Sequence, residues 1–202
     1  MTSKIPSISK RYADRAEDGD LVVEISFTGG NELGKGNPEL TDVRLRLLKK
    51  EADREHQVWT RDLGNVPMPT GAWHDFDLVQ CVAGKIYAGV SNSLRRFNLA
   101  DGAAEWTIEI GNTALVQVIP SSRRDMLIVC NTYSEYEHPK GLANLAAFSL
   151  EGNEVWRVAC NGEVFIGNAR FEDGVLLSNT FSCWEYQIDE RTGKVLAKTF
   201  TK

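Results

Sequence analysis

Short runs of apolar or alternating residues, separated by turn residues, make up most of this chain. In the third of four similar stretches the runs cover residues 114–119, 126–132, 143–150 and 154–160, with Pro, Gly, Ser and Asn between them. Runs of this length, rich in Val, Ile, Leu and aromatic residues, are typical of an antiparallel meander. No apolar period of 3.6 residues persists over three turns, so the pattern predicts an all-β protein.

The same order of four runs recurs along the chain. In the second stretch the predicted strands are 76–82, 85–90, 94–99 and 104–110, and in the fourth they are 164–169, 174–178, 183–188 and 194–200. The first stretch is the least regular: its clear strands are 21–27, 43–49 and 57–61, and a further strand is either near residues 7–13 or absent. We therefore predict one domain, 1–202, with repeats over 7–62, 63–111, 112–161 and 162–202.

A tryptophan closes three of the four repeats. Trp59, Trp106 and Trp156 recur at intervals of about 50 residues. A glycine stands four residues before the second and third of them, and the fourth repeat has Ala197 in the corresponding place. Repeat proteins depend on the interfaces between neighbouring units. We expect each indole to pack between adjacent sheets rather than to form a functional site.

These units resemble the repeats of the quinoprotein-alcohol-dehydrogenase-like propellers, the PQQ-like family. The segments that carry the resemblance are Gly84–Val90, Leu94–Gly102 with Trp106, Gly174–Ser178 and Ile188–Gly193. The resemblance implies a β-propeller-like array of four four-stranded antiparallel blades. Enzymes of that family use about seven or eight blades, a quinone, a calcium ion and often a disulfide between adjacent cysteines, and this chain has four repeats and no adjacent cysteines. We therefore expect no cofactor, and a closed ring, an open arc and arcs paired in a homodimer all remain open.

Charge and leader sequence exclude several classes of protein. The net charge is −5 and the pI about 5.3, so the chain lacks the basic character of a protein that binds nucleic acid or an anionic membrane. The N-terminus lacks an apolar signal sequence, and no run approaches the length of a membrane span, so we expect a cytoplasmic protein. The four cysteines lie far apart in apolar runs and are predicted to be buried, reduced thiols: Cys81, Cys130, Cys160 and Cys183.

Signals for catalysis and metal binding are weak. His56, His74 and His138 fall in different repeats without a carboxylate or cysteine at ligand spacing. Residues 29–36 approach a phosphate-binding loop, but Gly36 replaces the Ser or Thr that would contact Mg²⁺, and Pro38 stands where a helix should begin. The sequence predicts a protein that is not an enzyme, with no catalytic residues and no metal site.

Three long loops are predicted on one face of the array. They cover residues 28–40, 64–75 and 133–142, and long loops on a rigid scaffold commonly carry binding function. Their tyrosines offer contact area and their carboxylates can pair with a basic protein. The predicted partner-binding residues are Tyr133, Glu135, Tyr136, Glu137, Glu32, Glu39, Trp73 and Asp75.

Small, leaderless chains with these repeats resemble bacterial immunity proteins that protect a cell from type VI secretion toxins, including nucleases. The resemblance implies a cytoplasmic protein that binds a basic toxin domain and contacts neither nucleic acid nor a membrane. The alternative is a scaffold subunit similar to the propeller lipoproteins of outer-membrane assembly, which would need an export signal and a lipid-attachment cysteine.

Overall fold

The protein is an all-β array of four blades. The computed structural model describes residues 9–30, 40–52, 54–67, 77–111, 113, 115–131, 142–159 and 163–201. In these residues the regular secondary structure consists of strands, which form four four-stranded antiparallel sheets, each ordered as the strands follow in the chain. The predicted propeller-like array of four antiparallel blades is confirmed. The described part of the chain contains no helix with the length and apolarity needed to cross a membrane.

Each blade is a meander of consecutive strands. Blade 1 contains β1 (Ser9–Asp18), β2 (Leu21–Gly30), β3 (Leu40–Glu51) and β4 (Arg54–Pro67). Blade 2 contains β5 (Val79–Val82), β6 (Lys85–Val90), β7 (Ser93–Asn98) and β8 (Ala104–Glu109). Blade 3 contains β9 (Leu115–Pro120), β10 (Met126–Asn131), β11 (Leu142–Ser149) and β12 (Glu154–Ala159). Blade 4 contains β13 (Arg170–Glu172), β14 (Val175–Asn179), β15 (Trp184–Ile188) and β16 (Val195–Phe200).

The composition of each strand follows its depth in the blade. In β10 every residue is buried, because neighbouring sheets cover both faces of this strand. The outer strand β8 instead alternates: Trp106 and Ile108 are half-buried, whereas Glu105, Thr107 and Glu109 are exposed. The two-residue period of a strand explains this alternation, since one face packs on the next blade and the other meets water.

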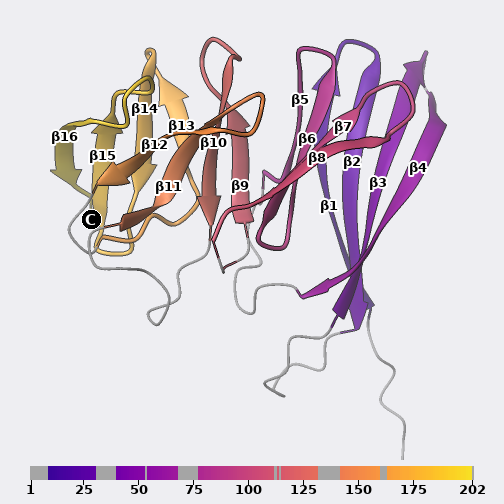
Figure 1. Ribbon diagram of the computed structural model, residues 1–202, viewed down its shortest axis with the longest axis horizontal. Helices are drawn as coiled ribbons and strands as arrows, with labels where there is room; N and C mark the ends of the chain where they lie inside the picture. Colours follow the sequence, from indigo (N-terminus) through magenta and orange to yellow (C-terminus); the bar gives the residue numbers. More distant parts are fainter. Residues whose placement is uncertain are drawn as a thin grey trace, which may run out of the picture.

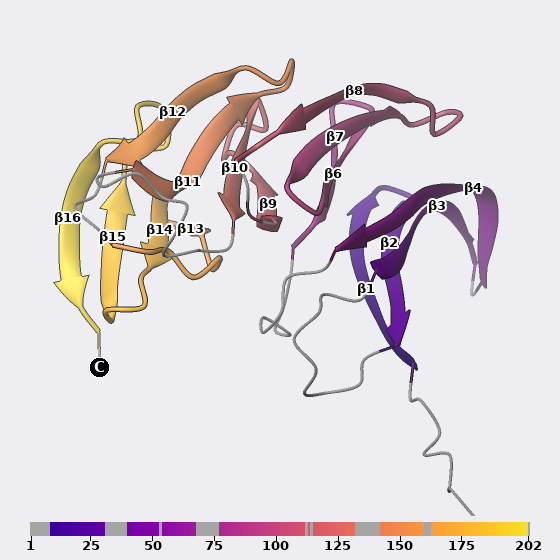
Figure 2. The ribbon, with the colours of Figure 1, turned by 60° about the horizontal axis from the view of Figure 1, so that its bottom comes forward.

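The blades follow one another along an open arc. Figure 2 shows β16 at one end of the arc and the β1–β4 sheet at the other. The first strands of neighbouring blades lie side by side, β1 beside β5 and β5 beside β9 (Figure 1). A parallel bridge between Asp77 and Gln117 joins the second of these pairs. The apolar core runs through all four blades, from Val23 in β2 to Ile188 in β15.

Three details of the sequence-based prediction are wrong. The first strand of blade 4 is Arg170–Glu172 rather than residues 164–169, because Phe165 and Ala169 hydrogen-bond to blade 3 instead. β2 continues to Gly30 and β4 to Pro67, so the first two predicted loops begin later than residues 28 and 64. Cys183 is exposed, since it lies in the turn before β15 with a φ of 60°, whereas Cys81 and Cys130 are buried as predicted. Cys160 lies outside the described residues.

Candidate functional site

The predicted binding loops attach to one edge of the arc. In an antiparallel four-stranded blade, the second and fourth strands end on the edge where the third strand begins. We call this the loop edge; in Figure 1 it is the lower edge, where β2 ends at Gly30, β4 at Pro67 and β10 at Asn131. All eight predicted binding residues lie outside the described residues, in the segments that these strand ends flank: Glu32, Glu39, Trp73, Asp75, Tyr133, Glu135, Tyr136 and Glu137.

The opposite edge, which we call the turn edge, is held by tryptophans that pack on glycines. This edge carries the turns that join the third strand of each blade to the fourth. Trp59 packs on Gly102 of blade 2 and donates its indole N–H to the carbonyl of Leu99 at 3.0 Å. Trp156 packs on Gly193 of blade 4 and donates to the carbonyl of Glu190 at 2.8 Å. The prediction that these tryptophans pack between sheets is confirmed.

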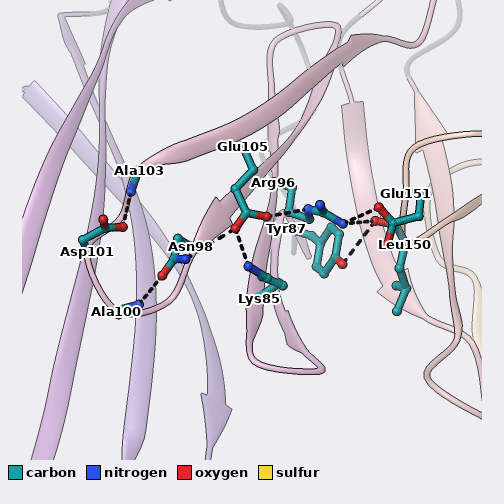
Figure 3. A network of polar contacts seen from close by, with 10 residues as sticks. All are labelled: Lys85, Tyr87, Arg96, Asn98, Ala100, Asp101, Ala103, Glu105, Leu150 and Glu151. Carbon is teal, nitrogen blue, oxygen red and sulfur yellow. Dashed lines mark hydrogen bonds and ion pairs between the residues drawn. The ribbon is translucent and has the colours of Figure 1, made fainter.

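The interface between blades 2 and 3 uses an arginine in place of this indole hydrogen bond. Trp106 lies near Gly152, but its buried indole N–H has no acceptor among the described residues. The carbonyl of Leu150 instead accepts the Nη1 hydrogen of Arg96 at 2.8 Å and the hydroxyl of Tyr87 at 3.3 Å (Figure 3). The Arg96 guanidinium lies 5.5 Å from the centroid of the Trp106 ring, so indole and cation stack at this interface.

Carboxylates on both sides balance the charge of this arginine. The Arg96 Nε lies 2.8 Å from Glu105 in its own blade, and Nη1 lies 3.0 Å from Glu151 in blade 3 (Figure 3). Lys85 also pairs with Glu105, and its hydrogen bond lowers the pKa of that carboxyl. The network therefore joins two blades and carries no strong net charge.

Further contacts on the turn edge join blades 3 and 4. The side-chain carboxylate of Glu190 accepts the backbone N–H of Ser122 at 2.9 Å, and Arg191 lies 2.8 and 2.7 Å from the two carboxylate oxygens of Asp125. The hydrogen bond from Arg191 lowers the pKa of Asp125. Arg96, Glu190 and Arg191 of the turn edge thus serve the contact between blades.

A half-buried carboxyl joins the inner strands of blades 1 and 2. The Asp14 Oδ2 accepts the backbone N–H groups of Leu78 and Val79 at 2.5 and 2.9 Å, and Oδ1 accepts that of Arg15 at 2.8 Å. Burial raises the pKa of Asp14 to about 6, although these three hydrogen bonds act in the opposite direction.

Two buried side-chain amides, those of Gln117 and Asn144, join blades 3 and 4. The Gln117 side chain accepts the backbone N–H of Ala169 at 2.7 Å and donates to its carbonyl at 3.0 Å. The Asn144 Oδ1 accepts the N–H of Phe165 at 2.9 Å, and its Nδ2 donates to the carbonyls of Phe165 and Asn131, both at 2.7 Å. Each amide satisfies backbone groups of the segment that connects β12 to β13, as buried polar groups require.

The outward face of blade 4 is largely polar, with Leu177 opposite Arg170 and Gln187. On its inner side, Tyr186 meets Phe165 edge to face at 5.4 Å, so the alternate residues Glu185 and Gln187 point away from blade 3. Glu185 pairs with Arg170 at 2.6 Å, and Thr199 and Ala197 stand opposite Glu185 and Gln187 on β16.

The outward face of blade 1 has the same character. Arg15, Glu24 and Arg46 stand opposite one another on β1, β2 and β3. Arg15 lies 3.9 Å from Glu24 and 2.6 Å from Glu55, and Arg46 lies 3.6 Å from Glu24. Both ends of the arc therefore carry charges that are already paired within the face.

The loop edge of blade 4 carries exposed apolar side chains that the sequence analysis did not identify. Phe181 is 73% exposed, Phe200 55% and Ile166 43%. Phe181 stands in the short turn between β14 and β15, and an aromatic residue in a polar turn was the signal available in the sequence. Among the described residues of the loop edge, these side chains are the clearest candidates for contact with another molecule.

Comparisons with known proteins support the fold and assign no activity. A family described as a domain of unknown function, DUF7957, matches residues 117–200, which is less than half of the chain. No curated protein matches. The computationally designed protein Ika8, whose crystal structure is similar to this fold, shares 8% sequence identity with this chain, with a TM-score of 0.56. The match covers 94% of this chain but 61% of Ika8. The designed protein Ika4 is 9% identical, with a TM-score of 0.50, and the match covers 66% of this chain and 77% of Ika4.

These findings define the chain as a β-propeller-like repeat protein with an open arc of four blades. Identities of this size show the fold alone. The chain spans less than two thirds of the length of Ika8.

Proposed function

We propose that the protein is a non-enzymatic binding module that docks a protein partner on its loop edge. One observation carries the proposal: many described charged groups of the turn edge and of both end faces are engaged in contacts within the protein, among them Arg96, Glu190 and Arg170. The loop edge is instead where the long connections between strands meet, on a rigid scaffold. The remaining edge is the one suited to recognition.

We further propose that the partner is basic, and that the protein is an immunity protein that neutralises a bacterial toxin, such as a nuclease delivered by type VI secretion. The net charge of −5 favours a basic partner. Glu135 and Glu137 would pair with Lys or Arg on the toxin surface that otherwise contacts nucleic-acid phosphates. Tyr136, between the two carboxylates in the sequence, and Tyr133, just before them, would add contact area. Glu32, Glu39, Trp73 and Asp75 would extend this contact along the same edge.

Co-expression with the protein encoded by the neighbouring gene tests the proposal, which expects that protein to be a toxin. A stable complex and loss of toxicity are the expected results. Replacing both Glu135 and Glu137 by Lys should weaken the complex, because like charges then face one another.

A control variant with the same change in net charge distinguishes an effect of the loop edge from an effect of the overall charge. Asp20 and Glu51 lie at the turn edge, are more than half exposed, and make weak ion pairs with Lys49 at 3.9 and 3.4 Å. Replacing both by Lys should leave binding intact. Equal loss in the two double variants would show that net charge acts without a defined surface, and absence of any complex would refute the proposed function.

A further inference from the structure

An apolar cluster ends the loop edge at blade 4. We call Ile166, Phe181 and Phe200 the apolar rim: Phe181 follows β14, Phe200 ends β16, and Ile166 lies in the segment that enters the blade. These are three of the six large hydrophobic side chains that are most exposed in the described residues. Isolated exposed apolar residues are ordinary, but several at one end of a sheet indicate a contact surface.

The backbone holds this rim rigidly. The N–H of Phe181 donates to the carbonyl of Val164 at 3.0 Å, and the N–H of Ile166 donates to that of Asn179 at 3.0 Å. A bridge between Phe165 and Thr180 lies between these two bonds. Phe181 and Ile166 therefore project from a fixed two-segment ribbon, and little entropy is lost when a partner covers them.

The rim is not the uncovered remainder of an interface between blades. On the outward face of blade 4 the positions that would meet another sheet hold Glu185 and Gln187 beside the apolar Leu177 and Ala197. Glu185 is paired with Arg170 on this face. Covering such a face would bury paired charges at a desolvation cost. The exposure of Phe181 thus belongs to the loop edge and not to the end of the arc.

The charges beside the rim cancel locally. Lys198 lies 4.2 Å above the Trp184 ring and 3.9 Å from Glu163, and Phe200 meets Trp184 edge to face at 5.2 Å. This end of the loop edge is therefore apolar without a strong charge, whereas the predicted binding loops are rich in carboxylates.

We propose that the apolar rim is the hydrophobic anchor of the partner-binding surface, taking an apolar side chain that the protein partner presents beside its basic residues. The inference rests on the proposed function and adds a second kind of contact to it. Protein interfaces combine an aromatic, desolvated centre with polar and charged surroundings, and the aromatic residues commonly dominate the affinity. Phe181, the most exposed member, supplies most of this contact.

Measuring affinity for the co-expressed toxin domain by calorimetry tests the anchor. Phe181→Ser should weaken binding about tenfold or more. Leu196→Ser is the matched control, because Leu196 is on the same blade, is 56% exposed, and lies at the start of β16 near the turn edge. It should change the affinity less than about twofold, and equal melting temperatures of both variants and the unmodified protein would show intact folds.

The exposed thiol of Cys183, in the same turn as Phe181, allows a second measurement. With Cys160 replaced by Ser and Cys81 and Cys130 buried, a photo-crosslinking maleimide should label Cys183 and crosslink to the toxin. Wild-type affinity of Phe181→Ser together with no crosslink would overturn the anchor while leaving the proposed function intact. Failure to obtain any complex would refute both. Self-association that Phe181→Ser abolishes, with unchanged toxin binding, would show that the rim joins two copies of this chain and would likewise overturn it.

Discussion

Replacing Gly193 by Ala should destabilise blade 4 much more than a glycine substitution elsewhere in the same sheet. Gly193 has a φ of +69°, and an added Cβ would lie 2.7 Å from Cδ2 and Cε3 of the Trp156 indole. Gly174 is the matched control: its φ is +79°, it lies in the same blade, and its Cβ would meet nothing within 4 Å.

The two substitutions share one cost and differ in another. A left-handed backbone costs an L residue about 1–2 kcal/mol, which applies to both sites. Carbon atoms in contact prefer about 3.5–4.0 Å, so the indole must move by close to 1 Å in Gly193→Ala. Overpacking of this kind costs about 1–3 kcal/mol. Movement of the ring also strains the hydrogen bond from Trp156 to the carbonyl of Glu190, for about 1 kcal/mol more.

We therefore expect a loss of about 3–6 kcal/mol for Gly193→Ala and about 1–2 kcal/mol for Gly174→Ala, from the magnitudes above. Urea unfolding followed by tryptophan fluorescence and by circular dichroism measures both. Adding Trp156→Phe completes a double-mutant cycle, in which the smaller ring should recover part of the Gly193→Ala loss. Equal destabilisation by the two alanine substitutions, or no coupling to Trp156, would refute the proposed packing of indole on glycine.

Three further substitutions test the polar contacts. Because the pKa of Asp14 is raised to about 6 from 3.8, the folded protein binds this proton more tightly than the unfolded chain; the associated stability is complete below about pH 4 and lost as pH rises through 6. Relative to Asp14→Asn, the unmodified protein should therefore gain about 1–3 kcal/mol between pH 7 and pH 4 in thermal unfolding, and parallel pH profiles would contradict this. Asn144→Ala removes the partner of the buried Phe165 N–H and leaves its carbonyl only the weak Cys130 thiol donor, which should cost about 2–4 kcal/mol in urea unfolding. A change below about 0.5 kcal/mol would mean that water replaces the amide. Arg191→Gln removes an exposed ion pair with Asp125 and should cost at most about 1 kcal/mol, less in 1 M salt, so a larger or salt-independent loss in calorimetry would show that the contact is not an ordinary surface pair.

The recurrence of Trp and Gly made the blades predictable, because spacing along a strand determines which face a side chain occupies. Trp59 and Trp156 pack as the repeat implies. Trp106 does not make the same hydrogen bond, because the carbonyl of Leu150 accepts a hydrogen bond from Arg96 on the neighbouring strand instead. An arginine opposite the tryptophan, at a position where an interface normally has an apolar residue, was the available signal. Which group of blade 3 this arginine contacts depends on how the two blades pack together, and the sequence of one strand does not specify that.

The open form of the arc was harder to read from the sequence. Glu185 and Gln187 alternate with Tyr186 and Ile188 as polar residues do in any half-exposed strand. Only the placement of Tyr186 against Phe165 shows which set faces the neighbouring blade. The strand pattern therefore predicts that one face is polar, and the three-dimensional structure is needed to identify it as the end of the arc.

The chemistry of the two ends also bears on how a partner is recognised. Paired charges such as Arg170 with Glu185 gain little from being covered, because the loss of hydration offsets the attraction between the charges. A contact that closed the arc or stacked another sheet on it would bear this cost at both ends. A partner on the proposed loop edge would leave these ion pairs uncovered and would meet Phe181 and the predicted carboxylate loops along one side of the array. The paired charges of the end faces thus favour the proposed site on the loop edge over a site on either end face.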